Sequence, residues 1–209
     1  MNVEYVDILT PPRFEPSGVV KPVVDAIKAG DWLGVMNLWI VRPGPALLYQ
    51  ERPPGGWAPG KLDGSVGGYY RASESGLDGL REAEEELGWK CPEGDVTLIG
   101  RHLSVGVDEK GRERRLVVTV FMTYCDLPLA GFTLDPKEVP AIYEIPLANV
   151  VKALSDRRVT FTARGLSSGG QPVERVTSGD DFSYVFGGYH LRIAQIAKKF
   201  AEGQRVFCY

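Results

Sequence analysis

Residues 67–89, GGYYRASESGLDGLREAEEELGW, most constrain the fold, because they set a glycine pair, an isolated glutamate and an acidic helix in a fixed order. An α-helix turns by about 100° per residue. Measured from Glu82, Glu85 lies about 60° away around the helix axis, and Glu86 and Asp78 lie about 40° away. The pattern therefore predicts a helix with four carboxylates on one face and a narrow apolar stripe on the other.

The crowded acidic face is a reason to expect a bound cation. Like charges three or four residues apart destabilise an isolated helix. Hard oxygen ligands grouped in this way suit Mg²⁺ or Mn²⁺, which share their other positions with water and substrate phosphates. Arg81 lies at the edge of the face, Glu84 points away from it, and Gly88 provides a left-handed C-terminal cap. An acidic stripe is also common on a purely solvated helix, so the helix alone leaves both interpretations open.

The segment resembles the Nudix box, G(x)5E(x)7REUxEExGU, in which U is an apolar residue. The second half of the pattern matches in full as REAEEELGW. In the first half, Gly68 and Glu74 have the required spacing, but six residues separate Glu74 from Arg81 where the pattern has seven. An alignment from Gly67 restores the length but puts Ser73 at the glutamate position. We prefer the first alignment, with a one-residue deletion before Arg81.

The resemblance implies a fold, a cofactor and several residue roles. The implied fold is α/β, with a mixed β-sheet sandwiched between α-helices. The implied cofactor is Mg²⁺ or Mn²⁺, with Glu82, Glu85 and Glu86 as the metal ligands. Glu74 is expected to orient Arg81, here across the shortened loop.

The general base stays open between glutamates inside and outside the box. Glu85 and Glu86 lie within it, and Glu138 in LDPKEVPAIY resembles an extra glutamate that family members often place beside the box. A solvated carboxylate next to Lys137 is the alternative interpretation of Glu138. The expected catalytic residues are Glu85, Glu86, Arg81, Glu74 and Glu138.

Substrate contacts are expected around the glycine pair. The residues assigned to this role are Gly67, Gly68, Arg52, Tyr69 and Arg71. The arginines can meet phosphate, and Tyr69, Tyr70 and Trp57 can stack on a base or ring. Successive residues of a strand face opposite sides, so one of the two tyrosines is expected to pack within the protein. The basic run of Arg112, Arg114 and Arg115 is expected to be a solvated strand end.

Composition agrees with one compact cytoplasmic enzyme. The chain has 209 residues, of which 44% are hydrophobic and 24% charged, as in one globular domain. A net charge of -3 argues against a nucleic-acid-binding surface. No pattern of a signal peptide or membrane span is found. The odd, scattered cysteines are typical of thiols in a reducing compartment.

Periodicity predicts a mixed α/β chain. Strands are expected at 34–41, 46–51, 96–105, 114–124 and 141–146, and helices at 19–29, 147–154 and 189–201. Such a sheet packs between helices. We expect a single domain over 1–209, with a Nudix core at about 32–154, an N-terminal helical extension and a C-terminal extension. The resemblance is also compatible with a homodimer.

The predicted function is metal-dependent hydrolysis of a phosphoanhydride bond in a small diphosphate, such as a nucleoside diphosphate derivative. One alternative is an isomerase, because PGKLDGSVGG resembles the Nudix subgroup related to isopentenyl-diphosphate isomerases. That reaction needs a protonating cysteine before the box, and residues 61–68 contain none. Another alternative is a catalytically reduced nucleotide-binding sensor, which the shortened loop suggests and the retained glutamates oppose.

Overall fold

The computed structural model describes residues 3–55, 57–107, 111, 113–183 and 188–205. Its strands are β1 Tyr5–Thr10, β2 Glu15–Pro22, β3 Trp32–Arg42, β4 Ala46–Glu51, β5 Leu62–Asp63, β6 Val66–Tyr69, β7 Thr97–Val107, β8 Glu113–Tyr124, β9 Ala141–Pro146, β10 Phe161–Ser167 and β11 Pro172–Thr177. Its helices are α1 Val23–Ala29, α2 Arg81–Leu87, α3 Leu147–Ser155 and α4 Tyr189–Ala201, with 3₁₀ turns η1 Gly76–Leu80, η2 Glu93–Asp95, η3 Leu129–Gly131 and η4 Gly179–Asp181. Within these ranges, no helix has the length and apolar character needed to cross a membrane.

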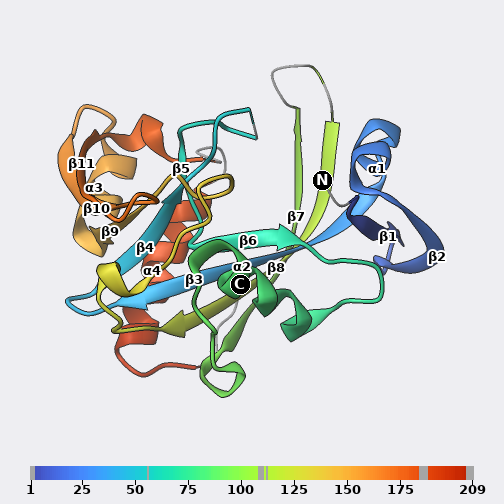
Figure 1. Ribbon diagram of the computed structural model, residues 1–209, viewed down its shortest axis with the longest axis horizontal. Helices are drawn as coiled ribbons and strands as arrows, with labels where there is room; N and C mark the ends of the chain where they lie inside the picture. The colour runs from blue at the N-terminus through green and yellow to red at the C-terminus, as the bar shows by residue number, and fades with distance from the viewer. Residues whose placement is uncertain (1–2, 56, 108–110, 112, 184–187, 206–209) are drawn as a thin grey trace.

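The strands of the described residues form one mixed sheet around β3. The main path runs β11-β10-β9-β4-β3-β1-β2, with β5 paired to β4 and β6 paired to β3. Strand β3 is antiparallel to β4 and β6 but parallel to β8, which carries β7 as its other neighbour. Figure 1 shows β3 crossing the middle of the molecule with β6 and α2 beside it. The central strand thus supports the segment that contains the box.

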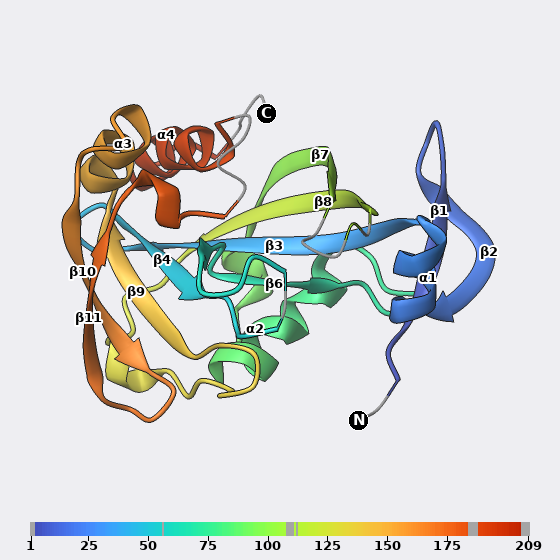
Figure 2. The same cartoon turned by 90° about the horizontal axis from the view of Figure 1, so that it is seen from above.

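Alternation along β3 divides the apolar side chains between two cores. Met36, Leu38 and Ile40 share one core with Ala83 and Leu87 of α2. Trp39 and Val41 lie in the other, with residues of α3 and α4. Figure 2 accordingly shows α3 and α4 on one side of β3 and α2 on the other. The predicted mixed sheet between helices is confirmed. Apolar side chains point to both faces of a central strand, so helices must cover both faces of the sheet.

Most elements of the predicted core are confirmed within one or two residues. β4, β9 and α4 have the predicted bounds, and β3, β7, β8 and α3 are slightly longer than predicted. These segments carry clear alternation or helical periodicity, so local pattern and tertiary packing agree. The DEKGR segment at 108–112, which we expect to form the turn of a hairpin between these two strands, lies outside the described residues except for Gly111.

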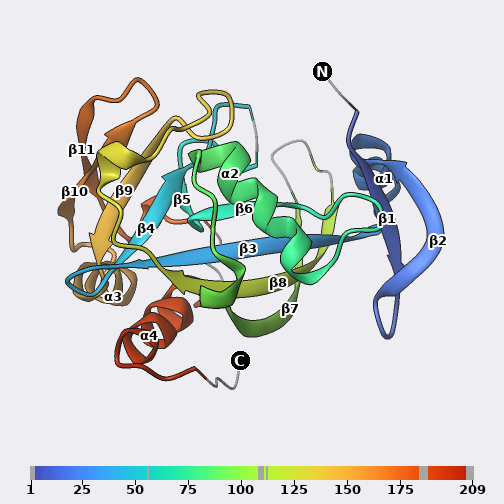
Figure 3. The ribbon, with the colours of Figure 1, turned by 60° about the horizontal axis from the view of Figure 1, so that its bottom comes forward.

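The expected N-terminal helix at 19–29 is wrong over its first four residues. Strand β2 extends to Pro22, and α1 begins only at Val23. Proline lacks the N–H that a helix interior needs, so it suits the position before the first helical residue. β2 pairs with β1, and β1 pairs with β3. The N-terminal segment therefore adds two strands to the sheet, and only its last part, α1, is helical. Figure 3 shows this hairpin at the end of the sheet, beside α1.

The sheet also continues beyond the predicted core at its other end. β10 and β11 form a hairpin that extends the sheet from β9. Neither strand was predicted, because burial in β11 does not follow hydrophobicity: Arg175 is half-buried and Val176 is exposed. Exposed and half-buried residues alternate along β11, and an edge strand of this kind gains its stability from pairing more than from its own sequence.

Candidate active site

The box helix forms as two joined pieces with the predicted apolar stripe. η1 runs directly into α2, and Leu80, Ala83 and Leu87 are buried. Glu84 is exposed on the outer side, as predicted. Gly88 ends the helix in the left-handed conformation, at φ 61°, which glycine adopts without strain. The apolar stripe of the helix therefore packs against the core beside β3, and Glu82 and Glu86 lie on another side of the helix.

Three glutamates converge beside the glycine pair. One carboxylate oxygen from each of Glu82, Glu86 and Glu138 lies within 4.8 Å of the others. Glu82 is 6% exposed and Glu86 is 3% exposed, while Glu138 is open to solvent. Two carboxylates from one helix and a third from a distant loop form a set of oxygen donors suited to a divalent cation.

Backbone hydrogen bonds bring Glu138 to this position. The N–H of Thr133 donates to the carbonyl of Leu87 at 2.9 Å, and the N–H of Asp135 donates to the carbonyl of Glu86 at 3.0 Å. The loop is thus attached to the last turn of α2, where helix carbonyls lack partners within the helix. The structure places Glu138 in the glutamate cluster, which the sequence suggested only through the resemblance.

Burial and mutual repulsion disfavour the charged forms of these glutamates. Burial raises the pKa of Glu82 to about 7, the charge of Glu85 adds to this effect, and Arg81 acts against it. Burial also raises the pKa of Glu86, and the charge of Glu82 raises it further. The backbone N–H of Gly67 donates to Glu86 at 3.3 Å, which is weak compensation for a buried carboxylate. A bound divalent cation would remove this cost, so the donor set fits Mg²⁺ or Mn²⁺.

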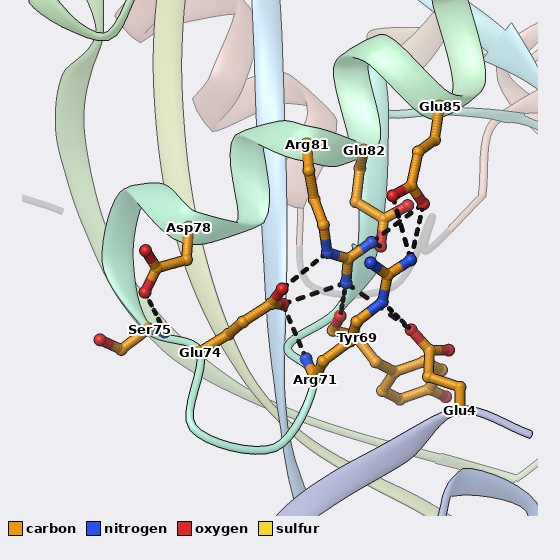
Figure 4. A network of polar contacts seen from close by, with 9 residues as sticks. All are labelled: Glu4, Tyr69, Arg71, Glu74, Ser75, Asp78, Arg81, Glu82 and Glu85. Atoms are coloured by element: carbon orange, nitrogen blue, oxygen red, sulfur yellow. Dashed lines mark hydrogen bonds and ion pairs between the residues drawn. The ribbon is translucent and has the colours of Figure 1, made fainter.

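Arg81 is held by Glu74 in spite of the deletion. Its Nε donates to Glu74 Oε1 at 2.8 Å, and its Nη2 donates to Glu74 Oε2 at 3.1 Å and to the carbonyl of Tyr69 at 3.0 Å (Figure 4). A 3₁₀ helix rises about 2.0 Å per residue and an α-helix about 1.5 Å. The 3₁₀ turn η1 therefore spans the distance with fewer residues, and the expected contact forms.

Glu85 faces two arginines instead of the glutamate cluster. Arg71 Nη2 donates to Glu85 Oε2 at 2.9 Å, and Arg81 Nη1 donates to the same oxygen at 3.1 Å. Arg71 therefore lies at the acidic helix and not in a substrate cleft. The metal-ligand role of Glu85 stays a prediction that requires its carboxylate to leave these arginines.

A carboxylate from the first residues of the chain joins the same network. Glu4 Oε1 lies 3.6 Å from Arg81 Nη2 and 3.7 Å from Arg71 Nε (Figure 4). Nothing in the local sequence marks Glu4, because its position depends on how the N-terminal hairpin joins β3. Arg71 and Arg81 thus form ion pairs both with glutamates of the box and with Glu4 of the N-terminal segment.

Asp78 does not lie on the acidic face where the helical angles placed it. Its Oδ2 accepts a hydrogen bond from the N–H of Ser75 at 2.9 Å, so it caps the first turn of η1. A 3₁₀ helix turns by about 120° per residue, which moves Asp78 away from Glu82 over four residues. The acidic face therefore loses one of its four expected members.

An open cleft of about 460 Å³ lies on the other side of the glycine pair, and part of this volume is continuous with solvent. Four of the five residues assigned to substrate binding line it, namely Arg52, Gly67, Gly68 and Tyr69. Asn37, Gln50, Asp63 and Arg114 also line it and were not predicted. A Cβ atom at Gly68 would lie 2.8 Å from Glu82 Cγ and closer still to the carboxylate. The absence of side chains at Gly67 and Gly68 therefore leaves only backbone between the cleft and the glutamate cluster.

The interpretation of Arg114 as a solvated strand end is wrong. Its Nη2 donates a hydrogen bond to the Tyr69 hydroxyl. Its guanidinium carbon lies 5.2 Å from the centroid of the Trp57 ring and 5.7 Å from that of Tyr69. Arg115 points to the other face of β8 and pairs with Glu113 at 2.9 Å, and Arg112 lies outside the described residues. Strand alternation could have separated Arg114 from Arg115, but only the tertiary structure shows the two rings.

The two neighbouring tyrosines divide as strand alternation predicts. Tyr69 lines the cleft. Tyr70 packs against the core on the α2 side, and its hydroxyl donates to the carbonyl of Gly76 at 3.0 Å. Only Tyr69 is therefore available to a ligand in the cleft.

Comparison with known proteins finds similarity to Nudix proteins. No family model matches the chain. An uncharacterized Nudix hydrolase of Clostridium acetobutylicum is 25% identical over 176 residues, which cover 78% of this chain and 82% of the relative. A crystal structure from Deinococcus radiodurans has a TM-score of 0.57 and 18% identity, and the match covers 73% of this chain and 89% of that one.

A crystal structure of a MutT/nudix family protein from Enterococcus faecalis has a TM-score of 0.50 and 14% identity, and the match covers 81% of this chain and 62% of that one. Together, the box, the curated relative and these folds confirm the Nudix resemblance and the Nudix fold. The subgroup related to isopentenyl-diphosphate isomerases is not confirmed by these relatives.

Proposed function

We propose that this protein is a metal-dependent pyrophosphohydrolase that cleaves the phosphoanhydride bond of a small diphosphate, such as a nucleoside diphosphate derivative. The observation that carries the proposal is the convergence of Glu82, Glu86 and Glu138 at a glycine pair that borders an open cleft. Support also comes from the relative named as a Nudix hydrolase. A binding module without catalysis has no need of buried carboxylates that repel one another.

The residues of the site have distinct roles in this proposal. Glu82 and Glu86 would hold Mg²⁺ or Mn²⁺, with the exposed Glu138 beside them and open to water, and Glu85 would join the ligands after leaving Arg71 and Arg81. When bound, the cation neutralises charge on the phosphates and helps to ionise an attacking water. Arg81, braced by Glu74, holds the carboxylates of α2 in position. Arg52 in the cleft is placed to meet a phosphate oxygen.

Among the candidate general bases, Glu138 is the exposed member of the cluster, so water reaches it most easily. We therefore assign the base to Glu138, with Glu86 and Glu85 as the alternatives. Glu138→Gln is expected to lower kcat by at least about tenfold, because general base catalysis contributes about 10²–10⁴-fold and a metal can supply part of it. The measurement is kcat with a saturating substrate, and Lys137→Gln in the same loop is the matched control. A Glu138→Gln enzyme with kcat within a few-fold of the original would remove Glu138 from the mechanism.

The brace on Arg81 gives a second prediction. In Glu74→Gln, the amide oxygen can accept only one of the two bonds from Arg81, without the negative charge, and the amide NH₂ group cannot accept the other. Arg81 therefore holds the metal-binding carboxylates less firmly. We expect kcat to fall by about tenfold, which is the range seen when outer partners of metal ligands are changed. Glu84→Gln, on the exposed side of the same helix, should leave kcat unchanged. Equal kcat for both variants would show that Glu74 has no part in positioning.

The proposed function is tested with a panel of diphosphates. The purified protein is incubated with ADP-ribose, dinucleoside polyphosphates, nucleotide sugars, NADH or coenzyme A, with Mg²⁺ or Mn²⁺ present or removed by chelation. Phosphate is then measured after phosphatase treatment of the products. Metal-dependent release from at least one compound is the expected result. Tight binding without turnover would favour a nucleotide-binding sensor. In a separate incubation without phosphatase, conversion of isopentenyl diphosphate to its isomer would favour an isomerase.

The proposal also covers the cellular location, the type of substrate and the oligomeric state of the enzyme. We propose a cytoplasmic enzyme that acts on a small molecule and not on nucleic acid, and that can form a homodimer. Sedimentation of the purified protein measures its oligomeric state directly, and a single species with the mass of one chain would contradict the dimer.

A further inference from the structure

The open cleft contains a guanidinium group that no carboxylate of the described residues neutralises. Arg114 is half-buried, and its side-chain hydrogen bond is donated to the neutral hydroxyl of Tyr69. Among the residues that the structure describes, no carboxylate pairs with Arg114, and its buried Nε has no hydrogen-bond partner. A partly buried arginine is ordinarily paired with a carboxylate or phosphate. The missing partner is therefore expected from a ligand.

The rings beside Arg114 fix the guanidinium in place. Trp57 and Tyr69 both lie within about 6 Å of it, which is the range of a cation–π interaction. A guanidinium held against aromatic rings keeps its planar donors in one orientation, which favours a flat or tetrahedral anion. Because Arg114 contacts both rings, a ligand that reaches Trp57 and Tyr69 also meets a positive charge.

The other charges of the cleft leave this positive charge in excess. Arg52 Nε lies 4.0 Å from Asp63 Oδ2, so these two groups approximately balance each other. The cleft therefore carries the charge of Arg114 as its surplus. The glycine pair separates this region from the glutamate cluster. The surplus charge lies on the cleft side of β6, opposite the proposed metal site.

Gln50 is an independent sign that the cleft takes a polar ligand. It lines the cleft, is only 1% exposed, and its Oε1 has no hydrogen-bond partner among the described residues. Leaving a buried polar atom unsatisfied is costly, so such atoms are uncommon in folded proteins and call for a ligand or water. An amide can accept a bond from a hydroxyl or N–H group.

We infer that the cleft binds the part of the substrate remote from the scissile diphosphate, and that this part carries an additional anionic group held by Arg114 and a hydroxyl or N–H group bonded to Gln50. This inference rests on the proposed function and narrows its substrate class. The preferred substrates are diphosphates with a further phosphate or carboxylate beyond the diphosphate. Compounds that lack this group are poorer substrates.

Pairs of compounds that differ only by one remote anionic group test the inference. Coenzyme A and dephospho-coenzyme A form one such pair, and NADPH and NADH form another. We expect kcat/KM to be higher for the charged member of at least one pair by at least about tenfold, as one charge-assisted contact provides. Arg114→Gln should remove this preference, because it should lower kcat/KM for the charged member by at least about tenfold more than for the uncharged member. Arg115→Gln, the same change on the opposite face of β8, should retain the preference.

Two further variants distinguish an effect of charge on the substrate preference from an effect of misfolding. Arg114→Lys keeps the charge without the planar donors, so it should retain part of the preference. In Gln50→Glu, the new side chain has nearly the same shape and adds a negative charge beside the expected anion. This variant should therefore lower kcat/KM for the charged member of a pair more than for the uncharged member. Thermal unfolding of each variant shows whether it has folded.

The outcomes distinguish the inference from the proposed function. Equal kcat/KM for both members of every hydrolysed pair would overturn the inference and leave the hydrolase intact. Hydrolysis of no compound would count against the hydrolase, and the same pairs would then be compared by calorimetric binding to the unmodified protein. Equal Kd values there, or a charged-member preference that survives in Arg114→Gln, would also overturn the inference.

Discussion

Replacing Glu86 by glutamine is expected to abolish most of the activity while making the metal-free protein more stable. The loss in kcat should be on the order of 10³-fold, because the variant loses a ligand that helps to neutralise charge in the transition state. Glutamine keeps the shape and can still accept the hydrogen bond from Gly67. It also removes a buried ionisable group whose charged form is disfavoured by burial and by Glu82. The measurements are kcat with saturating Mg²⁺ and Tm without metal.

The gain in stability follows from the burial of the glutamates. Burial and the charge of Glu82 disfavour the ionised form of Glu86, and the neutral amide of glutamine avoids this cost in free energy. Relief of about 1 kcal/mol would raise Tm by about 2–4 °C in a protein of this size. Glu84→Gln, on the exposed side of α2, should change neither kcat nor Tm. A Glu86→Gln protein with the original kcat would refute the assignment of the glutamate cluster.

The same electrostatics predict how pH affects the metal-free protein. Burial raises the pKa of Glu82 from 4.5 to about 7 and shifts the pKa of Glu86 in the same direction. Protonation of these groups therefore stabilises the fold fully below about pH 4.5, and this contribution is lost as the pH rises through 7. Mg²⁺ binds the ionised carboxylates, so its effect on Tm should be larger at about pH 8 than at about pH 5. An equal effect at both values would contradict the raised pKa values.

Replacing Gly68 by alanine is expected to damage the metal site without unfolding the protein. The added Cβ would overlap the side chain of Glu82, whose flexible end can move away. The fold then survives, but Glu82 leaves the position that it shares with Glu86 and Glu138. A displacement of about 1 Å in a catalytic group can cost on the order of 10²-fold in rate. We expect kcat to fall by this amount and the Mg²⁺ concentration needed for half-maximal activity to rise.

A matched glycine provides the control for this prediction. Gly94 has open space at the position of a Cβ and no strained backbone angle, so Gly94→Ala should leave kcat and the Mg²⁺ requirement unchanged. Calorimetric titration with Mn²⁺ measures the metal affinity of both variants directly. Unaltered Mn²⁺ affinity and kcat in Gly68→Ala would show that Glu82 is not held where the structure places it, or does not bind metal.

The helix, its cap and the central strands were predictable because local and tertiary preferences agree there. The stripe of Leu80, Ala83 and Leu87 has helical spacing, and Gly88 suits a left-handed cap. β4 and β9 show long apolar runs between turn residues, so their bounds follow from the sequence. The error at Asp78 arose because a 3₁₀ turn has a different angular step from an α-helix.

The sequence by itself determined which residue types the site contains, through the spacing of Glu82, Glu85 and Glu86 and the glycines before them. Only the tertiary structure decided which groups meet. It places Glu138 in the glutamate cluster by bonds between a loop and α2, turns Glu85 towards arginines, and sets Arg114 against Trp57. The physical reason is the separation along the sequence of the residues involved. Helical angles depend on neighbours within a few residues, whereas these contacts depend on how the distant strands β3, β6 and β8 pair.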